Sequence, residues 1–424
     1  MRVQVIGGGG REHALAWVLA QSAEVEAIIC APGNAGIAAE PKVTCAPIAA
    51  DDLEGQIRLA RRQHSDMVVV GPEQPLVSGI ADRLIEEGIV TVGPNRQAAA
   101  LEGSKVFAKE QMQRFNIPTA SCRVFDRSDA AIRFVREHPQ PWVVKADGLA
   151  AGKGVLICQD AFEAERAVHL LMDERAFGEA GEHILIEELL SGEEVSCIAL
   201  TDGATIRLLP SSQDHKRALD GDRGPNTGGM GAYSPAPVLT AELEQEVLAR
   251  VFRPLLLGMA AAGSPYRGFL YAGLMVGADG PRVLEFNVRL GDPETQALFM
   301  RLRSDLAPAL RACANGTLDH APLTWDSRPA VCVVIAAGGY PGDYDKNNVI
   351  SGLDSVERLP DTKVFHAGTR LLNGQVLTNG GRVLGVTALG HDIRQAQQHA
   401  YQAVNHIAFA DMAFRRDIAH RALE

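Results

Sequence analysis

The chain opens with Met-Arg-Val-Gln-Val-Ile-Gly-Gly-Gly-Gly-Arg-Glu-His (residues 1–13), in which a short apolar run leads into four glycines. Residues 3–6 have the length and the Val/Ile content of a buried strand, and the pattern of residues 11–20 is typical of a helix. Four glycines allow the tight turn that joins such a strand to such a helix. The stretch therefore predicts the first strand and helix of a doubly wound α/β domain.

The same alternation continues through the first hundred residues. Apolar runs at 27–30, 67–70 and 89–92 predict further parallel strands, and residues 53–63 predict a helix between them. We therefore assign residues 1–100 to a Rossmann-like domain. Ligands of such domains bind at the carboxyl ends of the strands.

Residues 101–325 are expected to form a second unit with α+β character. A helix over 101–115 leads into a small subdomain at 120–190, with strands at 142–146, 155–158 and 184–188. Further on, a hairpin is predicted from apolar runs at 269–276 and 282–288, which Asp279-Gly280 connects.

The remaining segments are less regular. Residues 211–237 are rich in glycine, proline and charge and predict a long loop, which in a compact domain is usually functional or disordered. Residues 326–424 are expected to form a small α+β domain, with strands at 330–336 and 382–388 and a helix at 392–409.

Composition excludes several classes of protein. The 424 residues have a net charge of −11, which argues against a general nucleic-acid-binding protein. The seven cysteines contain no CxxC pair, so neither a zinc ribbon nor a redox dithiol is indicated. No apolar run approaches ~18 residues and no leader precedes the first strand, so we expect a cytoplasmic protein without a membrane partner. We also expect a monomer.

The glycine turn is a candidate anion site. Backbone N–H groups at Gly9 and Gly10 and the charge of Arg11 would suit a phosphate at the start of the helix. The alternative is a turn whose glycines serve only packing. A dinucleotide is disfavoured, because the third glycine of that fingerprint is missing.

A second glycine-rich turn follows the predicted strand at 142–146. The sequence Lys145-Ala-Asp-Gly-Leu-Ala-Ala-Gly-Lys-Gly154 is similar to a P-loop but has Gly154 where Ser or Thr is required, and a strand follows it. A turn between two strands, with Lys145 and Lys153 on it, would suit a lid over phosphates. The alternative is a hairpin turn with two solvated lysines.

The strongest local signal is Leu-Glu-Phe-Asn-Val-Arg at residues 284–289. Strand alternation places Glu285, Asn287 and Arg289 on one face and the apolar residues on the other. A carboxylate and an amide two residues apart offer oxygen ligands for Mg²⁺ shared with substrate phosphates. The alternative is a half-exposed strand before a helix that Asp292 caps and Pro293 begins.

These motifs, in this order, resemble the ATP-grasp superfamily and, within it, the glycinamide ribonucleotide synthetases. The similarity rests on sequences spread along the whole chain: Gly-Gly-Arg-Glu-His (9–13), Ala-Pro-Gly-Asn-Ala-Gly (31–36), Val-Gly-Pro-Glu (70–73), Leu-Glu-Gly-Ser-Lys (101–105), residues 145–155, Ser-Gln-Asp-His-Lys-Arg (212–217), residues 224–233, Glu-Phe-Asn-Val-Arg-Leu-Gly-Asp-Pro-Glu-Thr (285–295), residues 336–342, Ala-Gly-Thr (367–369) and Thr-Asn-Gly-Gly-Arg-Val (378–383).

The resemblance implies a reaction that joins glycine to 5-phosphoribosylamine with ATP, in purine synthesis, and that passes through glycyl phosphate. It implies roles for individual residues. Glu285 and Asn287 would hold Mg²⁺, with Mn²⁺ as an alternative. Residues near ATP would be Lys105, Lys145, Gly152, Lys153, Gly154, Glu187, Glu188, Leu189 and Glu194. Substrate would meet Gly9, Gly10, Arg11, Asp214, Lys216, Arg217 and Arg289, and the chemistry would depend on Lys145, Arg289 and Asp292.

Two other functions stay open from the sequence. One is a different ATP-grasp enzyme, such as a carboxylase or another ligase of purine synthesis. The other is a nucleotide-sensing protein without catalysis, against which the presence of Lys145, Glu285, Asn287 and Arg289 argues.

Overall fold

The computed structural model describes residues 1–150 and 154–423 of the chain. Its N-terminal sheet has five parallel strands in the order β3-β2-β1-β4-β5. They are β1 (Arg2–Gly7), β2 (Ala27–Pro32), β3 (Val43–Cys45), β4 (Met67–Val70) and β5 (Val90–Val92). The predicted doubly wound domain is confirmed, and β3 adds a strand that the sequence did not predict.

Helices cover both faces of this sheet. They include α1 (Gly10–Gln21), α2 (Leu53–Gln63), α3 (Glu73–Val77) and α4 (Ile80–Glu86). Along β4, Met67 and Val69 share a buried cluster with the leucines of α1, whereas Val68 and Val70 share another with apolar residues of α2 and α4. The two-residue repeat of the strand thus directs alternate side chains to opposite helices.

The predicted helix over 101–115 is wrong as a single element. The structure has α5 (Arg96–Gly103) and then α6 (Lys105–Arg114). Ser104 has extended backbone angles, and its Oγ accepts a hydrogen bond of 3.0 Å from the Phe107 N–H. Helix α5 ends at Gly103, and the Ser104 side chain caps the start of α6. Helical periodicity alone does not reveal this break.

The small subdomain forms a four-stranded antiparallel sheet, the outer sheet, in the order β6-β9-β7-β8. Its elements are β6 (Cys122–Phe125), α7 (Ser128–Glu137), β7 (Trp142–Ala146), β8 (Val155–Cys158), α8 (Ala161–Val168) and β9 (Ile184–Glu188). The three strands that the sequence predicted here are confirmed. Apolar residues of α7 and α8 and of the strands form a core of their own.

The central sheet has the order β11-β10-β16-β17 and is antiparallel. Its strands are β10 (Glu193–Thr201), β11 (Ile206–Leu208), β16 (Gly268–Gly277) and β17 (Gly280–Asn287). Helices α9 (Ala241–Val247) and α10 (Arg253–Ala261) precede β16 in the chain. The predicted hairpin is present, but β17 ends at Asn287, so Arg289 lies just beyond the strand.

The C-terminal sheet has the order β12-β15-β18-β22-β19. Its strands are β12 (Gln213–Asp214), β15 (Gly231–Ser234), β18 (Ala330–Ala336), β19 (Thr362–His366) and β22 (Arg382–Leu389), and helix α14 (Ile393–Val404) packs on it. Helix α14 is five residues shorter at its end than the predicted helix to residue 409. Strands β20 (Thr369–Leu372) and β21 (Gln375–Thr378) form a separate hairpin.

The prediction of a long loop at residues 211–237 is wrong. Strands β12 and β15 from this segment join the C-terminal sheet, and β13 (Arg217–Leu219) and β14 (Arg223–Asn226) form a hairpin between them. Ser212 and Tyr233 are fully buried, so the polar composition of the segment does not place it at the surface.

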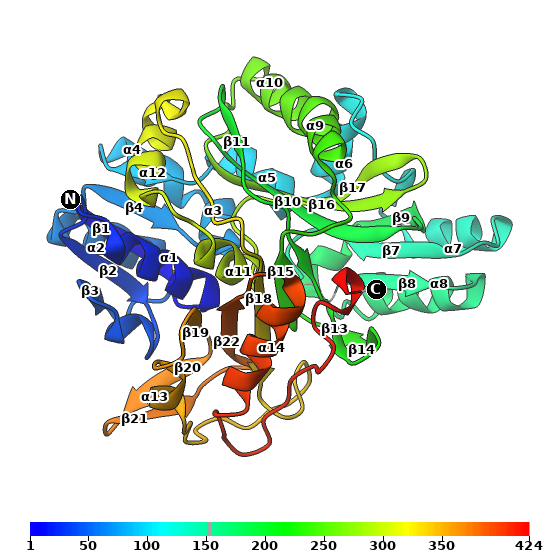
Figure 1. Ribbon diagram of the computed structural model, residues 1–424. Helices are drawn as coiled ribbons and strands as arrows, with labels where there is room; N and C mark the ends of the chain where they lie inside the picture. Colours follow the sequence, from blue (N-terminus) through cyan, green and yellow to red (C-terminus); the bar gives the residue numbers. More distant parts are fainter. Residues whose placement is uncertain (151–153, 424) are drawn as a thin grey trace.

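The four larger sheets surround the middle of the molecule (Figure 1). The N-terminal sheet and the outer sheet lie on opposite sides, at left and right in this view, with the central sheet between them and the C-terminal sheet below. Within residues 1–150 and 154–423, no helix has the length and apolar content to cross a membrane.

Candidate active site

A cavity of about 830 Å³ lies where these sheets meet. We call it the main cavity. The residues predicted for the site that line it are Arg11, Lys105, Lys145, Gly154, Glu187, Glu188, Leu189, Glu194, Asp214, Lys216, Arg217, Glu285, Asn287, Arg289 and Asp292. Gly9 lines a second cavity, and Gly10 lines neither of the two. Gly152 and Lys153 lie outside the described residues.

Glu285 and Asn287 lie on β17, opposite Gly273 and Tyr271 of β16. Burial tends to raise the pKa of Glu285, but the ammonium groups of Lys216, Lys145 and Lys105 outweigh it, so the pKa is lowered and the carboxylate is ionised. Among the described residues no group of three or more His, Cys, Asp and Glu could hold a metal. The carboxylate and the amide fit Mg²⁺, which takes few protein ligands and completes its shell with substrate phosphates and water.

Three lysines from β7 and α6 also line the cavity. Lys145 Nζ on β7 donates to Leu284 O at 3.2 Å and lies 3.0 Å from Glu187 Oε2. Lys109 Nζ on α6 lies 3.2 Å from the same oxygen, and Lys105 Nζ donates to Gly148 O at 2.8 Å. Lysine 145 thus connects the outer sheet to the central sheet, while Glu187 holds it in place.

Sequence reasoning missed Lys109. The residue is only 3% exposed and lines the main cavity. Burial lowers its pKa, while Glu187 acts in the opposite direction. Its position one helical turn after Lys105 was the available signal, because residues four apart share a helix face.

Glu187 was predicted to border adenine. It does line the cavity, but one of its oxygens already pairs with two lysines and the other has no hydrogen-bond partner among the described residues.

Arg289 is held by two carboxylates. Its Nε lies 3.1 Å from Glu73 Oε2, its Nη2 lies 2.8 Å from Glu102 Oε1, and its Nη1 donates to Leu290 O at 3.2 Å. Glu102 also accepts the Val288 N–H at 2.7 Å, and burial raises its pKa to about 7 despite the nearby guanidinium. A guanidinium has five N–H donors, so Arg289 keeps donors for a ligand after these contacts.

The start of α1 is occupied by carboxylates of the protein. Gly9 N–H donates to Glu12 Oε2 at 2.6 Å, and Arg11 N–H donates to Asp292 Oδ2 at 3.3 Å. Arg11 itself bonds to Glu12 Oε1 and to Leu290 O. A Cβ at Gly8 would lie 2.5 Å from Gly33 O, so close packing requires glycine there. Packing therefore explains much of this motif, as the alternative interpretation proposed.

The glycine turn also borders the second cavity, of about 360 Å³. The end of the N-terminal sheet meets residues next to the β20–β21 hairpin there, and the lining includes Gly7–Gly9, Pro32–Asn34, Ala367–Thr369 and Asn379. Asn34 links the two sides, because its Nδ2 donates both to Gly8 O and to His366 O, at 2.9 and 2.7 Å. The motifs at 31–36 and 367–369, distant in the sequence, thus form one site.

Asp292 does not cap the helix that follows it, as the sequence had suggested. Pro293 occupies the N-cap position of α11 (Glu294–Met300), and Asp292 Oδ1 instead accepts from Gln296 Nε2 at 2.9 Å. Arg382 donates to the Asp292 carbonyl at 2.6 Å. Asp292 therefore ties α1, α11 and the C-terminal sheet together through its carboxylate and its backbone carbonyl. Arg382 is a lining residue that was missed.

Acidic residues lie on the wall formed by β10 and β12. Lys216 Nζ pairs with Glu194 Oε2 at 2.7 Å. Asp214 has no hydrogen bond or ion pair from its carboxylate to another described residue, and burial raises its pKa to about 7 against the opposing charge of Lys216. A buried carboxyl group without a hydrogen-bond partner suits a cationic group of a ligand.

Family models agree with this architecture. The N domain of phosphoribosylglycinamide synthetase matches residues 1–102, the ATP-grasp (A) domain of the same family matches residues 103–295 and its C domain matches residues 330–421.

Individual proteins are similar over the whole chain. A phosphoribosylamine–glycine ligase of Allochromatium vinosum is 55% identical over 424 residues, covering 100% of this chain and 99% of its own. One of Escherichia coli O157:H7 is 50% identical over 426 residues, again with 100% and 99% covered. The crystal structure of a phosphoribosylamine–glycine ligase from Thermotoga maritima matches with a TM-score of 0.83 and 34% identity, covering 99% of this chain and 100% of that one. A biotin carboxylase domain from Hydrogenobacter thermophilus, bound to MgADP, shares the fold at 17% identity, with a TM-score of 0.75 and coverage of 97% and 91%.

Proposed function

The chain belongs to the phosphoribosylglycinamide synthetase family, and from that premise we propose how its main cavity joins glycine to 5-phosphoribosylamine. The reaction converts ATP, glycine and 5-phosphoribosylamine into glycinamide ribonucleotide, ADP and phosphate, a step of purine synthesis. One observation carries the proposal: a single cavity brings together Lys145 of the outer sheet, the lysines of α6, the Glu285–Asn287 pair and the Asp214–Arg217 segment.

ATP is proposed to lie between the outer and central sheets. Adenine would lie against Glu187, Glu188 and Leu189, and the ribose hydroxyls would bond to Glu194. Lys105 and Lys145 would neutralise the phosphates, together with the turn that contains Gly152, Lys153 and Gly154. Glu285 and Asn287 would hold Mg²⁺, or Mn²⁺ in its place, and a bound ion would neutralise phosphate charge during transfer.

The chemistry needs an activated carboxylate, because a free carboxylate is a poor acyl donor. A carboxylate oxygen of glycine attacks the γ-phosphorus of ATP, ADP leaves, and glycyl phosphate forms. The amine of phosphoribosylamine then attacks the glycyl carbonyl and phosphate leaves. Lys145 would stabilise the first transfer, and the remaining donors of Arg289 would bind the oxyanion of the second.

The second substrate is proposed to enter from the N-terminal side. Gly9, Gly10 and Arg11 would bind phosphoribosylamine, with the second cavity next to them available for its phosphate. Asp214 is suited to the ammonium group of glycine because its carboxylate has no other partner among residues 1–150 and 154–423. Lys216, Arg217, Arg289 and Asp292 would surround the point where the two substrates meet.

We further propose a cytoplasmic monomer divided into residues 1–100, 101–325 and 326–424, with residues 120–190 as a lid that closes over ATP. Free cysteines at all seven positions are compatible with a reducing compartment.

The reaction is tested by the fate of an oxygen atom. We expect ADP release that requires both glycine and phosphoribosylamine. With glycine labelled by ¹⁸O in both carboxylate oxygens, each turnover should place one ¹⁸O in phosphate, since the bridging oxygen leaves with it, and one in the product amide. Mass spectrometry of the released phosphate measures this. Unlabelled phosphate would contradict the glycyl phosphate route.

Alanine should be a poor substrate. Its extra methyl would have to fit a site built for a residue without a side chain, and overpacking costs about 1–3 kcal/mol. This corresponds to roughly a 5- to 150-fold lower kcat/KM for alanine than for glycine. The comparison is made by coupled ADP release at saturating ATP and phosphoribosylamine, and equal values for both amino acids would contradict a closed glycine pocket.

A further inference from the structure

The β13–β14 hairpin forms part of the wall of the main cavity but is held to the molecule by few contacts. Lys216, just before β13, and Asn226, at the end of β14, both line the cavity. Within the described residues, β13 and β14 form a two-stranded sheet of their own. Between described residues, the hydrogen bonds and ion pairs that residues 217–226 make beyond the adjoining Lys216 and Thr227 go to the segment 415–421 near the C-terminus, which we call the tail.

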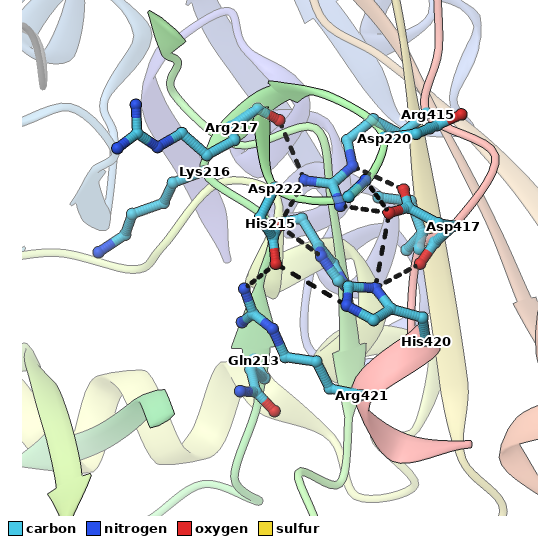
Figure 2. A network of polar contacts seen from close by, with 12 residues as sticks. Gln213, His215, Lys216, Arg217, Asp220, Asp222, Arg415, Asp417, His420 and Arg421 are labelled. Atoms are coloured by element: carbon cyan, nitrogen blue, oxygen red, sulfur yellow. Dashed lines mark hydrogen bonds and ion pairs between the residues drawn. The ribbon is translucent and has the colours of Figure 1, made fainter. Parts of the chain in front are cut away.

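Arg415 is the centre of this attachment (Figure 2). It is only 1% exposed, and its Nη1 donates to Arg217 O at 3.1 Å and to Asp222 Oδ1 at 2.8 Å. Asp417 pairs with the other side of the guanidinium and also accepts the Gly221 N–H at 2.8 Å. The tail, residues 415–421, therefore binds both the backbone and the turn of the hairpin.

Asp222 joins the tail to the cavity. Its Oδ2 accepts from Arg421 Nη2 at 2.6 Å, and both residues line the main cavity. Arg421 has no further hydrogen bond or ion pair within the described part of the chain, so its other N–H groups remain available. The charge of Lys216 lowers the pKa of Glu194 on the cavity wall, and the charge of Arg421 adds to this effect.

His215 strengthens the case that the hairpin has a defined position. Its Nε2 accepts the Ala419 N–H at 2.9 Å, so the neutral ring carries its proton on Nδ1. That atom lies 3.7 Å from Asp222 Oδ1 and has no hydrogen-bond partner among the described residues, although the ring is fully buried. Burial lowers the pKa of His215 to about 4, so it faces Asp222, Arg415 and Arg421 as a neutral donor.

We propose that the segment Arg415–Arg421 is a functional part of the active site, in which Asp222 is a positioning residue that fixes the β13–β14 hairpin and thereby places Lys216 for the substrates. The inference rests on the proposed ligation for the role of Lys216. Thr227 supports the connection, because its N–H and Oγ1 both donate to Lys216 O, at 2.7 and 2.9 Å, so the base of the hairpin sets the backbone of Lys216.

The test compares Asp222→Asn with Arg416→Ala in the full-length enzyme. Asparagine keeps the shape but loses the charge that both arginines need. Arg416 is the matched control, because it lies in the same segment, is exposed and joins the hairpin only through its backbone N–H. Displacing a binding group by about 1 Å can cost about a hundredfold in rate, so we expect a tenfold to hundredfold loss of kcat/KM for glycine in Asp222→Asn. Arg416→Ala should match the wild type.

Two further measurements separate positioning from general stability. Hydrogen exchange should become faster at the amides of residues 217–226 in Asp222→Asn, with the exchange of the other sheets unchanged. The double variant Asp222→Asn/Arg421→Gln should lose no more activity than the worse single variant, as for two groups that act through one contact. If Asp222→Asn fails to fold, the single variant Arg421→Gln replaces it in both measurements. Arg415 would still bind the carboxylates of Asp222 and Asp417 in that variant, so the fold should be retained.

The outcomes are distinct. Wild-type kcat/KM in Asp222→Asn, or a loss explained entirely by less folded protein, would overturn the positioning role. Losses that add in the double variant would overturn it as well. A wild-type enzyme without ADP release dependent on glycine and phosphoribosylamine would instead overturn the proposed function, and the exchange of residues 217–226 would still report whether the tail holds the hairpin.

Discussion

Glu285→Gln is expected to lower kcat by about a thousandfold while leaving the fold intact. Glutamine preserves the shape of the side chain on β17 but removes the negative charge that faces Lys105, Lys145 and Lys216. It also removes one of the two oxygen groups proposed to hold Mg²⁺. A group aimed at developing charge in an active site can contribute a factor of about 10² to 10³, and a metal ligand should lie at the upper end.

The measurement is initial-rate ADP release as a function of Mg²⁺ concentration. Partial recovery of kcat at high Mg²⁺ would support weakened metal binding. Asp279→Asn provides the control, because Asp279 is an exposed carboxylate at the turn between β16 and β17 of the same hairpin. Wild-type turnover of Glu285→Gln at ordinary Mg²⁺ would place the metal ligand elsewhere.

Lys145→Gln is expected to have an effect of similar size, about a hundredfold to a thousandfold on kcat. Its ammonium is proposed to neutralise the phosphate in transfer, and it also connects β7 to the carbonyl of Leu284 on β17. Glu187 would keep Lys109 as a partner at 3.2 Å, so the variant should not leave an unpaired buried carboxylate. A thermal unfolding midpoint within a few degrees of the wild type would show that the core is intact.

Lys145→Arg tests whether a point charge is needed. Arginine retains the positive charge, but its planar guanidinium does not fit a site shaped for an ammonium between Glu187 and Leu284. We therefore expect little recovery of kcat. Full activity in Lys145→Arg would show that charge alone is required, and full activity in Lys145→Gln would remove Lys145 from the proposed mechanism.

Parts of the fold that depend on local patterns were predictable. Strand β4 is a continuous apolar run, β7 is apolar apart from Lys145, and residues 284–287 of β17 alternate between apolar and polar. The break between α5 and α6 was not found, because Ser104 changes the backbone without interrupting the helical pattern. Residues 211–237 were misjudged for a similar reason: Gly and Pro are frequent there, yet β12 pairs with β15, and β15 pairs with β18 far along the chain.

The candidate site also has residues that local motifs predicted and contacts that they did not. The motifs indicated Glu285, Asn287 and Lys145 because their chemistry is visible in short stretches, and the structure brings all three to one cavity. The partners of Arg289 were not indicated, since Glu73 and Glu102 come from helices near the start of the chain. Such pairings depend on tertiary packing, and a single sequence records no distance between them.

The sharing of strands between segments has a consequence for dividing the chain into pieces. β15 pairs with β18, so the middle of the chain supplies a strand to the sheet formed by its last third. A fragment ending near residue 325 would leave β15 as an open edge with unsatisfied backbone groups, the kind of surface along which polypeptides aggregate. The boundaries along the sequence therefore do not mark independent modules. For expression of separate parts or for insertion of a fusion partner, the C-terminal sheet and residues 211–237 have to be treated as one inseparable unit.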